Sequence, residues 1–452
     1  MTRSLKSLWG RFLFQDRGVL PTKRLLWIFV FVSIVLLIRT VWDISWTFII
    51  IVNSVVLLVS LLDLRKSPNK HQLSFKRKIQ SEMERGLSYP VQIEIRNSSR
   101  HSLSFRFIDG ISQSFHNHFP FHGEMQKEET IVATYETTAE IRGRYEIHNL
   151  YFRYKSVLGL WEKQVTAVLH DEVKVIPDLT VTRNYLENAQ KFLLYDGLKI
   201  RKHQSGGGEF TKIRSFVVGD DPRKINWRQT AKLQQVMTNE YEPEHGKYIT
   251  ILIDCGRMMG AELTKGNRLE HVLEAALTVA AAALPKGDYV SVLAFSRDVK
   301  AYVPPAKEMA HLQTILQAIY NLKVDPAESN YAAVFTYLQT VQKKRSLILL
   351  FSDVRTFLHE ESALTYLKRL RQRHLFLMIG IEDELLRRKI KEKPVDIQNT
   401  MMKSIAQQQM LIKKREKTKW ESQGLQMIEA REEKLAITVV SHYIDVMNRG
   451  LL

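Results

Sequence analysis

Two aspartates stand directly after apolar runs in the second half of this sequence. Asp254 follows the run YITILI, and Asp353 follows LILLFS. Apolar runs of this length are typical of buried parallel strands, and ligands of such sheets bind beyond the carboxyl ends of the strands. Two carboxylates at such an edge would suit a metal-dependent hydrolase or transferase, which is one of the two function classes that we consider.

Other residues with possible chemistry are weaker candidates. His116, His118 and His122 would point the same way on an extended chain, and three histidines can hold zinc. Pro120 interrupts that run and no carboxylate stands close by to orient a ligand, so we expect solvated or packed histidines. Cys255 has no sequence signature that pairs it with a histidine, so we expect a packed thiol rather than a nucleophile.

The two aspartates must be positioned by strands and helices that alternate after residue 247. We expect strands at 248–254, 289–295, 346–351 and 375–381, and helices near 269–280, 307–322, 331–341 and 361–371. Buried strands that alternate with helices predict a doubly wound, mostly parallel sheet with helices on both faces. Before this region, residues 71–180 alternate apolar and polar residues in short runs with turn signals, which predicts a small β-sandwich.

The N-terminal region carries two long apolar runs. Residues 25–38 and 44–62 hold no charged residue, and the short turn between them carries Arg39 and Asp43. Runs of this kind predict a two-helix transmembrane hairpin over 25–62, in contact with membrane lipids. Because basic residues flank the outer ends of the runs, the positive-inside rule puts both termini and the later domains in the cytoplasm, at a bacterial plasma membrane.

The composition is basic, but the surplus is local. The chain has 452 residues, with 66 Lys+Arg against 48 Asp+Glu, a net charge of +18. A surplus of seven basic residues lies within 1–70 and of eight within 368–421. We therefore expect no nucleic-acid partner for this chain. For 368–421 a solvated face is favoured and lipid contact comes second, while nucleic acid is the least favoured of the three alternatives. One cysteine excludes a disulfide framework.

Residues 205–227 read SGGGEFTKIRSFVVGDDPRKINW. Together with the two apolar runs, this segment resembles the bacterial family known as domain of unknown function 58. The resemblance rests on the Gly-rich-Glu-Phe stretch at 206–210, on Arg214 with Phe216, on 219–221 with Arg223, and on 225–227. Asn226 stands where that family usually has Asp. The resemblance implies a von Willebrand factor A-like domain after the segment.

The same segment can be interpreted physically. Asp221 followed by Pro222 predicts a helix start. The charged residues could form ion pairs that lock the segment onto the sheet, or they could form a docking surface for a partner protein. The residues that we assign to this structural or docking motif are Glu209, Arg214, Gly219, Asp220, Asp221, Arg223, Trp227 and Lys232.

The resemblance also implies a candidate metal site. Domains of the von Willebrand A type commonly bind Mg²⁺ through Asp-x-Ser-x-Ser, a later Thr and a second Asp, all hard oxygen ligands. Asp254 and Asp353 match the two carboxylates, and Ser329 or Asn330 could supply the later ligand. Gly256 and Met258 stand where the two serines would be, so we expect a degenerate site and no cofactor.

These observations predict five segments. They are a basic N-terminus at 1–24, a transmembrane hairpin at 25–62, a β-sandwich-like domain at 71–180, the motif segment at 181–246, and a von Willebrand A-like domain with basic C-terminal helices at 247–452. The resemblance implies a non-enzymatic, membrane-anchored interaction module that partners a MoxR-type AAA ATPase in a chaperone-like or envelope-related system. The alternative is the metal-dependent enzyme with Asp254 and Asp353.

Overall fold

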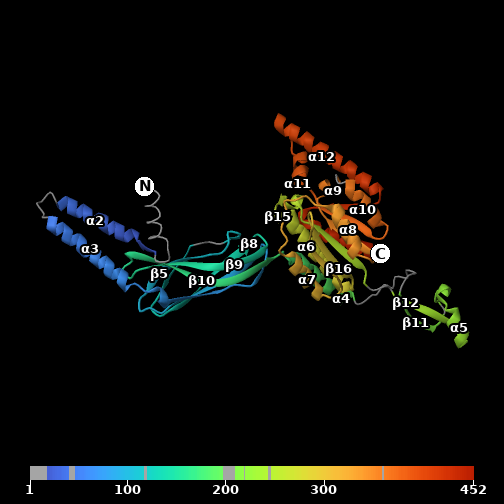
Figure 1. The fold of residues 1–452 in the computed structure, drawn as a ribbon, viewed down its shortest axis with the longest axis horizontal. Helices are drawn as coiled ribbons and strands as arrows, with labels where there is room; N and C mark the ends of the chain where they lie inside the picture. The colour runs from blue at the N-terminus through green and yellow to red at the C-terminus, as the bar shows by residue number, and fades with distance from the viewer. Residues whose placement is uncertain are drawn as a thin grey trace. The chain divides into compact units, whose positions relative to one another are not determined.

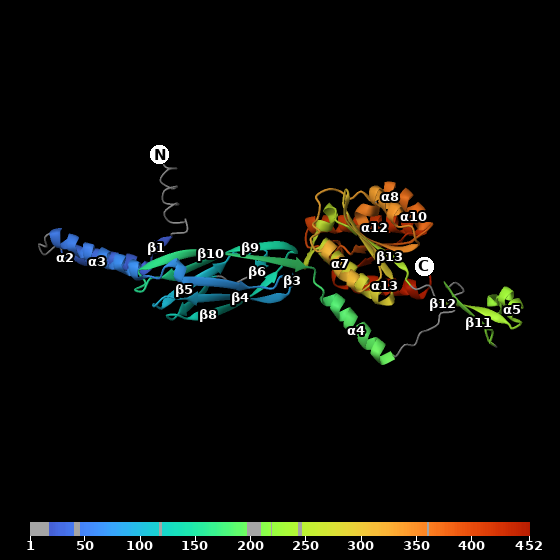
Figure 2. The same cartoon turned by 60° about the horizontal axis from the view of Figure 1, so that its bottom comes forward.

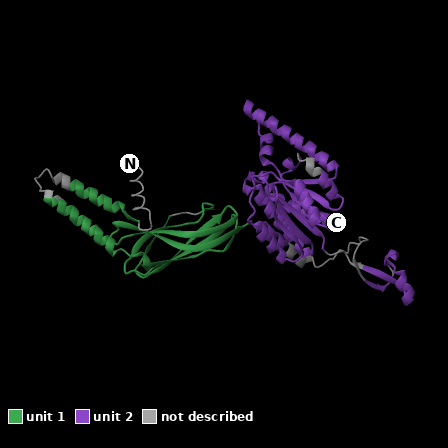
Figure 3. Ribbon diagram, in the orientation of Figure 1, with its two compact units in different colours: residues 1–176 green, residues 177–452 purple. Residues whose placement is uncertain are grey.

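The computed structural model describes residues 18–39, 46–116, 120–196, 209–217, 219–242, 246–358 and 361–452. The chain divides into two compact units, residues 1–176 and 177–452 (Figure 3). Each unit has its own sheets and its own apolar core. Residues 1–17, His118 and the glycines at 206–208 lie outside the described residues.

Within its described residues, the first unit has two α-helices and two mainly antiparallel sheets (Figures 1 and 2). Its helices are α2 (Lys23–Arg39), α3 (Trp46–Lys66) and the 3₁₀ turn η2 (Lys70–Gln72). Its strands are β1 (Val19–Pro21), β2 (Leu73–Lys78), β3 (Glu82–Glu84), β4 (Ser88–Asn97), β5 (Leu103–Asp109), β6 (Phe115–His116), β7 (Phe121–Met125), β8 (Thr130–Ala139), β9 (Gly143–Lys155) and β10 (Trp161–Ile176).

Alternating side chains join the two sheets of this unit. One sheet has the order β1-β10-β9-β5-β7, with β3 paired parallel to β10, and the other has the order β2-β4-β8-β6. Along β4, Val91, Ile93 and Ile95 are buried while their neighbours are not, as expected for a strand with one face on a core. These residues share one apolar cluster with Phe105 and Phe152 of the other sheet.

Arg77 of β2 is a buried cation between these two sheets, and its guanidinium is fully covered. It donates to Asp109 of β5 in a bidentate pair and to Asp171 of β10 at 2.9 Å. Its remaining N–H groups donate to the carbonyls of Ile147 and Asn149, at 3.2 and 3.3 Å. All five guanidinium donors are therefore used, which is what a buried arginine requires.

Helices α2 and α3 carry the two apolar runs, but the predicted transmembrane hairpin is wrong. Among the helices that the structure describes, none has both the length and the hydropathy needed to cross a membrane. At 1.5 Å per residue, the 17 residues of α2 span about 26 Å, against about 30 Å for a bilayer core. The hairpin over 25–62, the two plasma-membrane spans and the localisation inferred from them are therefore withdrawn.

The C-terminal end of α3 belongs to the fold of the first unit. The carboxylate of Asp63 accepts hydrogen bonds from the Ser156 hydroxyl at 2.5 Å and from the Leu158 N–H at 2.8 Å, both in the β9–β10 turn. The Trp161 indole donates to the Ser60 carbonyl at 2.9 Å. These contacts tie the last turns of α3 to the strands of the first unit.

The second unit is an α/β unit with a separate two-stranded hairpin. Its strands are β11 (Glu209–Ser215), β12 (Met237–Glu242), β13 (Tyr248–Asp254), β14 (Glu262–Leu263), β15 (Gly266–Asn267), β16 (Tyr289–Phe295), β17 (Val299–Ala306), β18 (Ser346–Phe351), β19 (Leu375–Ile381) and β20 (Gln426–Ala430). Its α-helices are α4 (Thr180–Asp196), α5 (Trp227–Leu233), α6 (Arg268–Ala283), α7 (Ala310–Ile319), α8 (Tyr331–Val341), α9 (Val354–Leu358), α10 (Glu361–Arg371), α11 (Glu384–Lys391), α12 (Ile397–Ser422) and α13 (Leu435–Asn448). Short 3₁₀ turns are η3 (Pro222–Lys224), η4 (Arg257–Gly260), η5 (Leu284–Lys286) and η6 (Glu432–Lys434).

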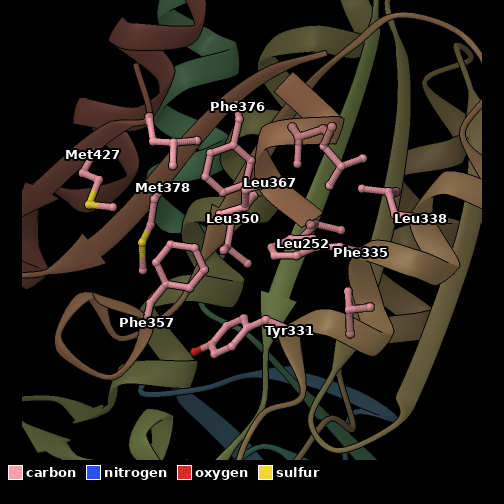
Figure 4. Packing of buried hydrophobic residues seen from close by; sticks show 14 of the residues in the cluster. Leu252, Tyr331, Phe335, Leu338, Leu350, Phe357, Leu367, Phe376, Met378 and Met427 are labelled. Carbon is pink, nitrogen blue, oxygen red and sulfur yellow. The ribbon is translucent and has the colours of Figure 1, made fainter. Parts of the chain in front are cut away.

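The main sheet has the order β17-β16-β13-β18-β19-β20, and only β17 runs antiparallel to its neighbour. Figure 4 shows the core on one face of this sheet, where Leu252 and Leu350 of the central strands meet Phe335 of α8 and Phe357 of α9. Helix α6 contacts β13 and β16 and packs against α4, α7 and α13, away from this cluster. Helices thus cover both faces, because each central strand is apolar on both sides.

Candidate functional site

The two aspartates predicted from the sequence lie at one edge of the main sheet. Strands β13 and β18 pair in parallel with Ile253 opposite Phe351, so Asp254 and Ser352 both stand where the paired strands end. Asp254 is 2% exposed, and Asp353 follows Ser352 at 6% exposure. The sheet topology therefore positions both carboxylates at the edge where α/β sheets bind ligands.

The Asp254 carboxylate is fully occupied by donors from the protein. Its Oδ1 accepts from the Gly256 N–H at 2.8 Å and from the Ser329 hydroxyl. Its Oδ2 accepts from the Tyr331 hydroxyl at 3.1 Å and from the Ser352 hydroxyl. A carboxylate offers about four acceptor positions, so this network uses all of them.

Burial dominates the electrostatics of this network. Desolvation raises the pKa of the Asp254 carboxyl, although hydrogen bonds from Ser329, Ser352 and Gly256 favour its ionised form. Burial and the nearby Asp254 charge raise the pKa of Tyr331 well above its ordinary value. The Tyr331 phenol therefore stays protonated and acts as a donor to the carboxylate.

Asp353 has a different set of partners. Its Oδ1 pairs with the guanidinium of Arg268, the first residue of α6, and both side chains are almost fully buried. Its Oδ2 accepts from the Thr356 N–H at 3.0 Å and the Thr356 hydroxyl at 2.8 Å. Asp353 thus caps the short helix α9 and neutralises a buried arginine.

Gly256 explains how the network differs from an Asp-x-Ser-x-Ser arrangement. A Cβ added at Gly256 would overlap the Ser329 hydroxyl, which occupies the place that a side chain at 256 would take. The hydroxyl beside Asp254 therefore comes from Ser329 and not from residue 256. Met258, at the other expected serine position, lines the adjoining pocket with a thioether.

A pocket of ≈ 380 Å³ adjoins Asp254. It is lined by Asp254, Arg257, Met258, Glu328, Ser329, Tyr331, Arg355 and Thr356. Arg257 pairs with Glu328 at 3.0 Å, and both side chains are exposed. The nearest contacts of the Arg355 guanidinium are longer, 3.3 Å to Gln409 and 3.8 Å to Asp383. Arg257 and Arg355 therefore line the same pocket in which a cation bound to Asp254 would lie.

The structure joins Asp254 to Ser329 but gives Asp353 other partners, so the three predicted ligands do not form one network. Within the described residues, no group of three or more His, Cys, Asp or Glu side chains is arranged to hold a metal ion. Sequence reasoning missed the donors Ser352 and Tyr331 and the arginine Arg268. The Asp353-x-x-Thr356 spacing is a capping signal that could have been recognised, whereas Arg268 and Tyr331 carry no local signal.

The predicted docking motif folds as a small hairpin of β11 and β12 with α5 beside it (Figure 2). Arg214 donates to both Asp220 oxygens, at 2.8 and 2.7 Å, and Asp220 also accepts from the Val217 N–H at 3.0 Å. The Arg214–Asp220 hydrogen bond lowers the pKa of the Asp220 carboxyl. Gly219 has φ +110°, a conformation that favours glycine, so it permits the turn that brings Asp220 back to Arg214.

Asp221 and Asn226 cap the next two helical segments of the hairpin. Asp221 accepts from the Arg223 N–H at 3.0 Å and begins η3, so the helix expected at this point is a single 3₁₀ turn. The α-helix α5 begins after Asn226, which accepts from the Gln229 N–H at 3.0 Å and donates to Asn239 at 2.9 Å. Asn at this position thus serves as a cap and as a bridge to β12.

The remaining motif residues lie on the surface of the hairpin. Trp227 is 69% exposed, and Arg223 and Lys232 are also exposed. Glu209 begins β11 opposite Glu242. The ion pair that holds the motif, Arg214 with Asp220, is internal to the hairpin and does not lock it onto the main sheet.

Residues 212–399 match the family model described as "Protein of unknown function DUF58". This DUF58 region contains most of the hairpin, the Asp254 network and the pocket. Among curated proteins, the uncharacterized protein YeaD of Bacillus subtilis (strain 168) is 28% identical over 126 residues, 28% of this chain. The aligned part spans 31% of YeaD, about a third of its length.

Similarity to solved structures is weak. The conserved hypothetical protein BatB from Bacteroides thetaiotaomicron aligns with 45% of this chain and 100% of its own, at 14% identity and TM-score 0.31. Salmonella alpha-2-macroglobulin reacted with methylamine aligns with 23% of this chain and 7% of its own, at 9% identity and TM-score 0.19. Scores this low support no argument, so the DUF58 match is the finding that we carry forward.

Proposed function

We propose that this chain is a non-enzymatic protein-interaction module that docks a MoxR-type AAA ATPase through the β11–β12 hairpin. The observation that carries the proposal is the exposure of Trp227 within the family-matched region. The ATPase as partner class comes from the resemblance of the 205–227 motif to its family. A chaperone-like or envelope-related role would follow from that partnership.

The hairpin surface has the composition of a binding hot spot. Val217, Leu233 and Val236 are 60%, 55% and 43% exposed, in the same hairpin as Trp227. Large exposed apolar side chains of this kind are costly in water unless a partner covers them, and Trp and Arg dominate interface energetics. The internal Arg214–Asp220 pair would hold this surface in shape before binding, which lowers the entropic cost of association.

The charge of the hairpin predicts the chemistry of its partner. Arg223, Arg228 and Lys232 are exposed around the apolar residues, beside the exposed Asp221. A partner with an apolar pocket rimmed by acidic side chains would therefore complement this surface. Charges at the rim are expected to affect the association rate more than the final affinity.

The proposal is tested by co-purification of the full chain with a MoxR-type AAA ATPase. Trp227→Ala is expected to weaken the complex by about 2 kcal/mol or more, roughly thirtyfold, as for a hot-spot residue. Arg223→Glu is expected to weaken it through charge reversal. Undiminished complex formation with both variants would refute docking through this hairpin.

Matched controls separate docking from general damage. Trp27→Ala removes a tryptophan that is 71% exposed on α2, and Arg100→Glu reverses an exposed charge in a turn of the first unit. Both control variants should bind the ATPase as the parent chain does. Circular dichroism of all four variants should match that of the parent.

The second candidate is a metal-dependent enzyme with Asp254 and Asp353, favoured by the pocket beside Asp254. The donor chemistry weighs against it, because Asp254 has no acceptor position left and Arg268 already neutralises Asp353. Calorimetric titration of the full chain with Mg²⁺ tests this candidate. Saturable heat that disappears in both Asp254→Asn and Asp353→Asn would favour the enzyme over the interaction module.

A further inference from the structure

Two histidines face each other on the exposed side of the first unit. His148 lies on β9 and His170 on β10, and their Nδ1 atoms are 3.0 Å apart. The two rings are nearly perpendicular, at 70°, with centroids 5.1 Å apart. Both residues are exposed, so an ion or a small ligand can reach the two nitrogens from solvent.

A β-bulge creates this contact. The ladder between β9 and β10 pairs Val168 with Asn149 and then Asp171 with Ile147, so two residues of β10 face His148 alone. In an uninterrupted ladder His170 would be opposite Ile147, which is 1% exposed and points to the core. The extra residue instead places His170 beside His148. Bulges often redirect a side chain at a functional site.

The separation of the two nitrogens suits a shared cation. Imidazole nitrogens bind Zn²⁺ at 2.0–2.1 Å, so two of them in one coordination sphere lie about 3.0–3.4 Å apart. The observed 3.0 Å falls at the lower end of that range. Imidazole also suits Ni²⁺ and Cu²⁺, whereas Mg²⁺ and Ca²⁺ prefer oxygen.

A carboxylate orients one of the two rings. Glu146 Oε2 lies 3.3 Å from His148 Nε2, the nitrogen away from His170. A carboxylate in this position holds the proton on Nε2 and leaves the Nδ1 lone pair for a ligand, as outer carboxylates do for metal-bound histidines. The two carboxylates that follow His170 have other partners, since Asp171 pairs with Arg77 at 2.9 Å and Glu172 with Arg144 at 2.7 Å.

We propose that His148 and His170 form a binding site for a late first-row divalent cation such as Zn²⁺, with Glu146 as the orienting carboxylate. Water completes the coordination, since the described residues supply no third histidine, cysteine or carboxylate to such a group. The bound ion would join β9 to β10 across the bulge. This site is independent of the proposed docking hairpin and of the Asp254 network.

Calorimetric titration of the full chain with ZnCl₂ tests the site, after purification through a tag that contains no histidine. One Zn²⁺ per chain is expected to bind, with saturable heat that is lost in His148→Gln and in His170→Gln. Glu146→Gln is expected to weaken binding by about 10–100-fold, as for other carboxylates that orient metal ligands. Zn²⁺ should also raise the melting temperature of the parent chain but not of the histidine variants.

His116→Gln is the matched control, because His116 is also exposed and its Nε2 lies 2.9 Å from Glu140. This variant should bind Zn²⁺ as the parent chain does. Binding that survives both His148→Gln and His170→Gln would overturn the proposal, as would loss of binding in His116→Gln. Absence of saturable heat in the parent chain would show that the 3.0 Å contact is only a hydrogen bond between two rings.

Discussion

One buried carboxylate from each unit shows a different way of burying an acid. In the first unit, Asp109 lies against the guanidinium of Arg77, so the buried negative charge faces a buried positive one. In the second unit, Asp254 receives only hydroxyl and amide donors, and burial raises its pKa. The comparison teaches that a buried acid needs either a counter-charge or a complete set of neutral donors.

The substitution with the largest expected effect on stability removes the counter-charge of Asp109. Arg77→Met removes the counter-charge of Asp109, which keeps only the Tyr135 hydroxyl as a donor, and leaves two strand carbonyls without the guanidinium. We expect a loss of about 3–5 kcal/mol of unfolding free energy, the usual cost of breaking a buried ion pair. Hydrogen exchange of peptides from β2 and β9 would measure this loss within the first unit.

Arg106→Met is the matched control for that substitution. Arg106 also makes a bidentate pair, with Glu162 at 2.9 Å, but its side chain is 40% exposed. An exposed pair contributes about 0–1 kcal/mol. If both variants lost the same stability, burial of the ion pair would not be what distinguishes Arg77.

The second effect concerns the neutral-donor network. Asp254→Ala removes the acceptor of the Ser329 hydroxyl and leaves the Ser352 and Tyr331 hydroxyls only each other, at 2.8 Å, and we expect a loss of about 3 kcal/mol of unfolding free energy. Asp254→Asn keeps an acceptor and the shape of the side chain, and we expect a loss of about 1 kcal/mol. Urea unfolding of the two variants at pH 7 measures both. Equal losses would mean that the ionised carboxylate, and not the neutral network, stabilises this corner.

The third effect tests the place of Ser329. Gly256→Ser should clash with the Ser329 hydroxyl and cost about 1–3 kcal/mol, as overpacking does. Adding Ser329→Gly should restore most of that loss, because the new side chain then has room. A double-mutant cycle in thermal unfolding measures the coupling, and a cycle without coupling would contradict the assigned overlap.

The smallest expected effect concerns Asp325, an acid that is only partly buried. Lys300 at 2.6 Å, followed by hydrogen bonds from Ala327 and Ser296, lowers the pKa of Asp325 to about 2. Because the folded value lies below the unfolded value of about 3.9, this acid stabilises the fold above pH 4. That contribution is lost as the pH falls from about 4 to about 2. The melting temperature of Asp325→Asn should change less across this window than that of the parent chain.

The strands of the main sheet could be predicted from the sequence, because apolar runs such as 248–254 and 346–351 are uninterrupted and end in polar residues. They are β13 and β18 with the expected bounds. The apolar runs at 25–38 and 44–62 are also uninterrupted, and for that reason they led to the wrong prediction of a transmembrane hairpin. Hydropathy does not reveal that Asp63 and Ser60 are bound by residues 93 to 101 positions later in the chain.

The Asp254 corner could be predicted only in part. Asp254 and Asp353 were predicted because each follows an apolar strand, and Ser329 was predicted because it precedes the helix that starts at 331. The partner Arg268 lies 85 positions from Asp353, and Tyr331 lies 77 positions from Asp254, so only the fold brings them together. The His148–His170 contact was beyond sequence reasoning, because it depends on a bulge that shifts the strand register by one residue.

The Arg77 clamp also constrains how the first unit reaches its fold. Arg77 pairs with Asp109, 32 positions later, and with Asp171, 94 positions later, so its set of partners is complete only when nearly the whole unit has been synthesised. Contacts of such long sequence separation require loop closure before they stabilise anything, and all-β units of this kind fold in milliseconds to seconds. During that interval the apolar faces of β4 and β5 are exposed. Apolar surface that is exposed in this way favours aggregation until the two sheets have packed together.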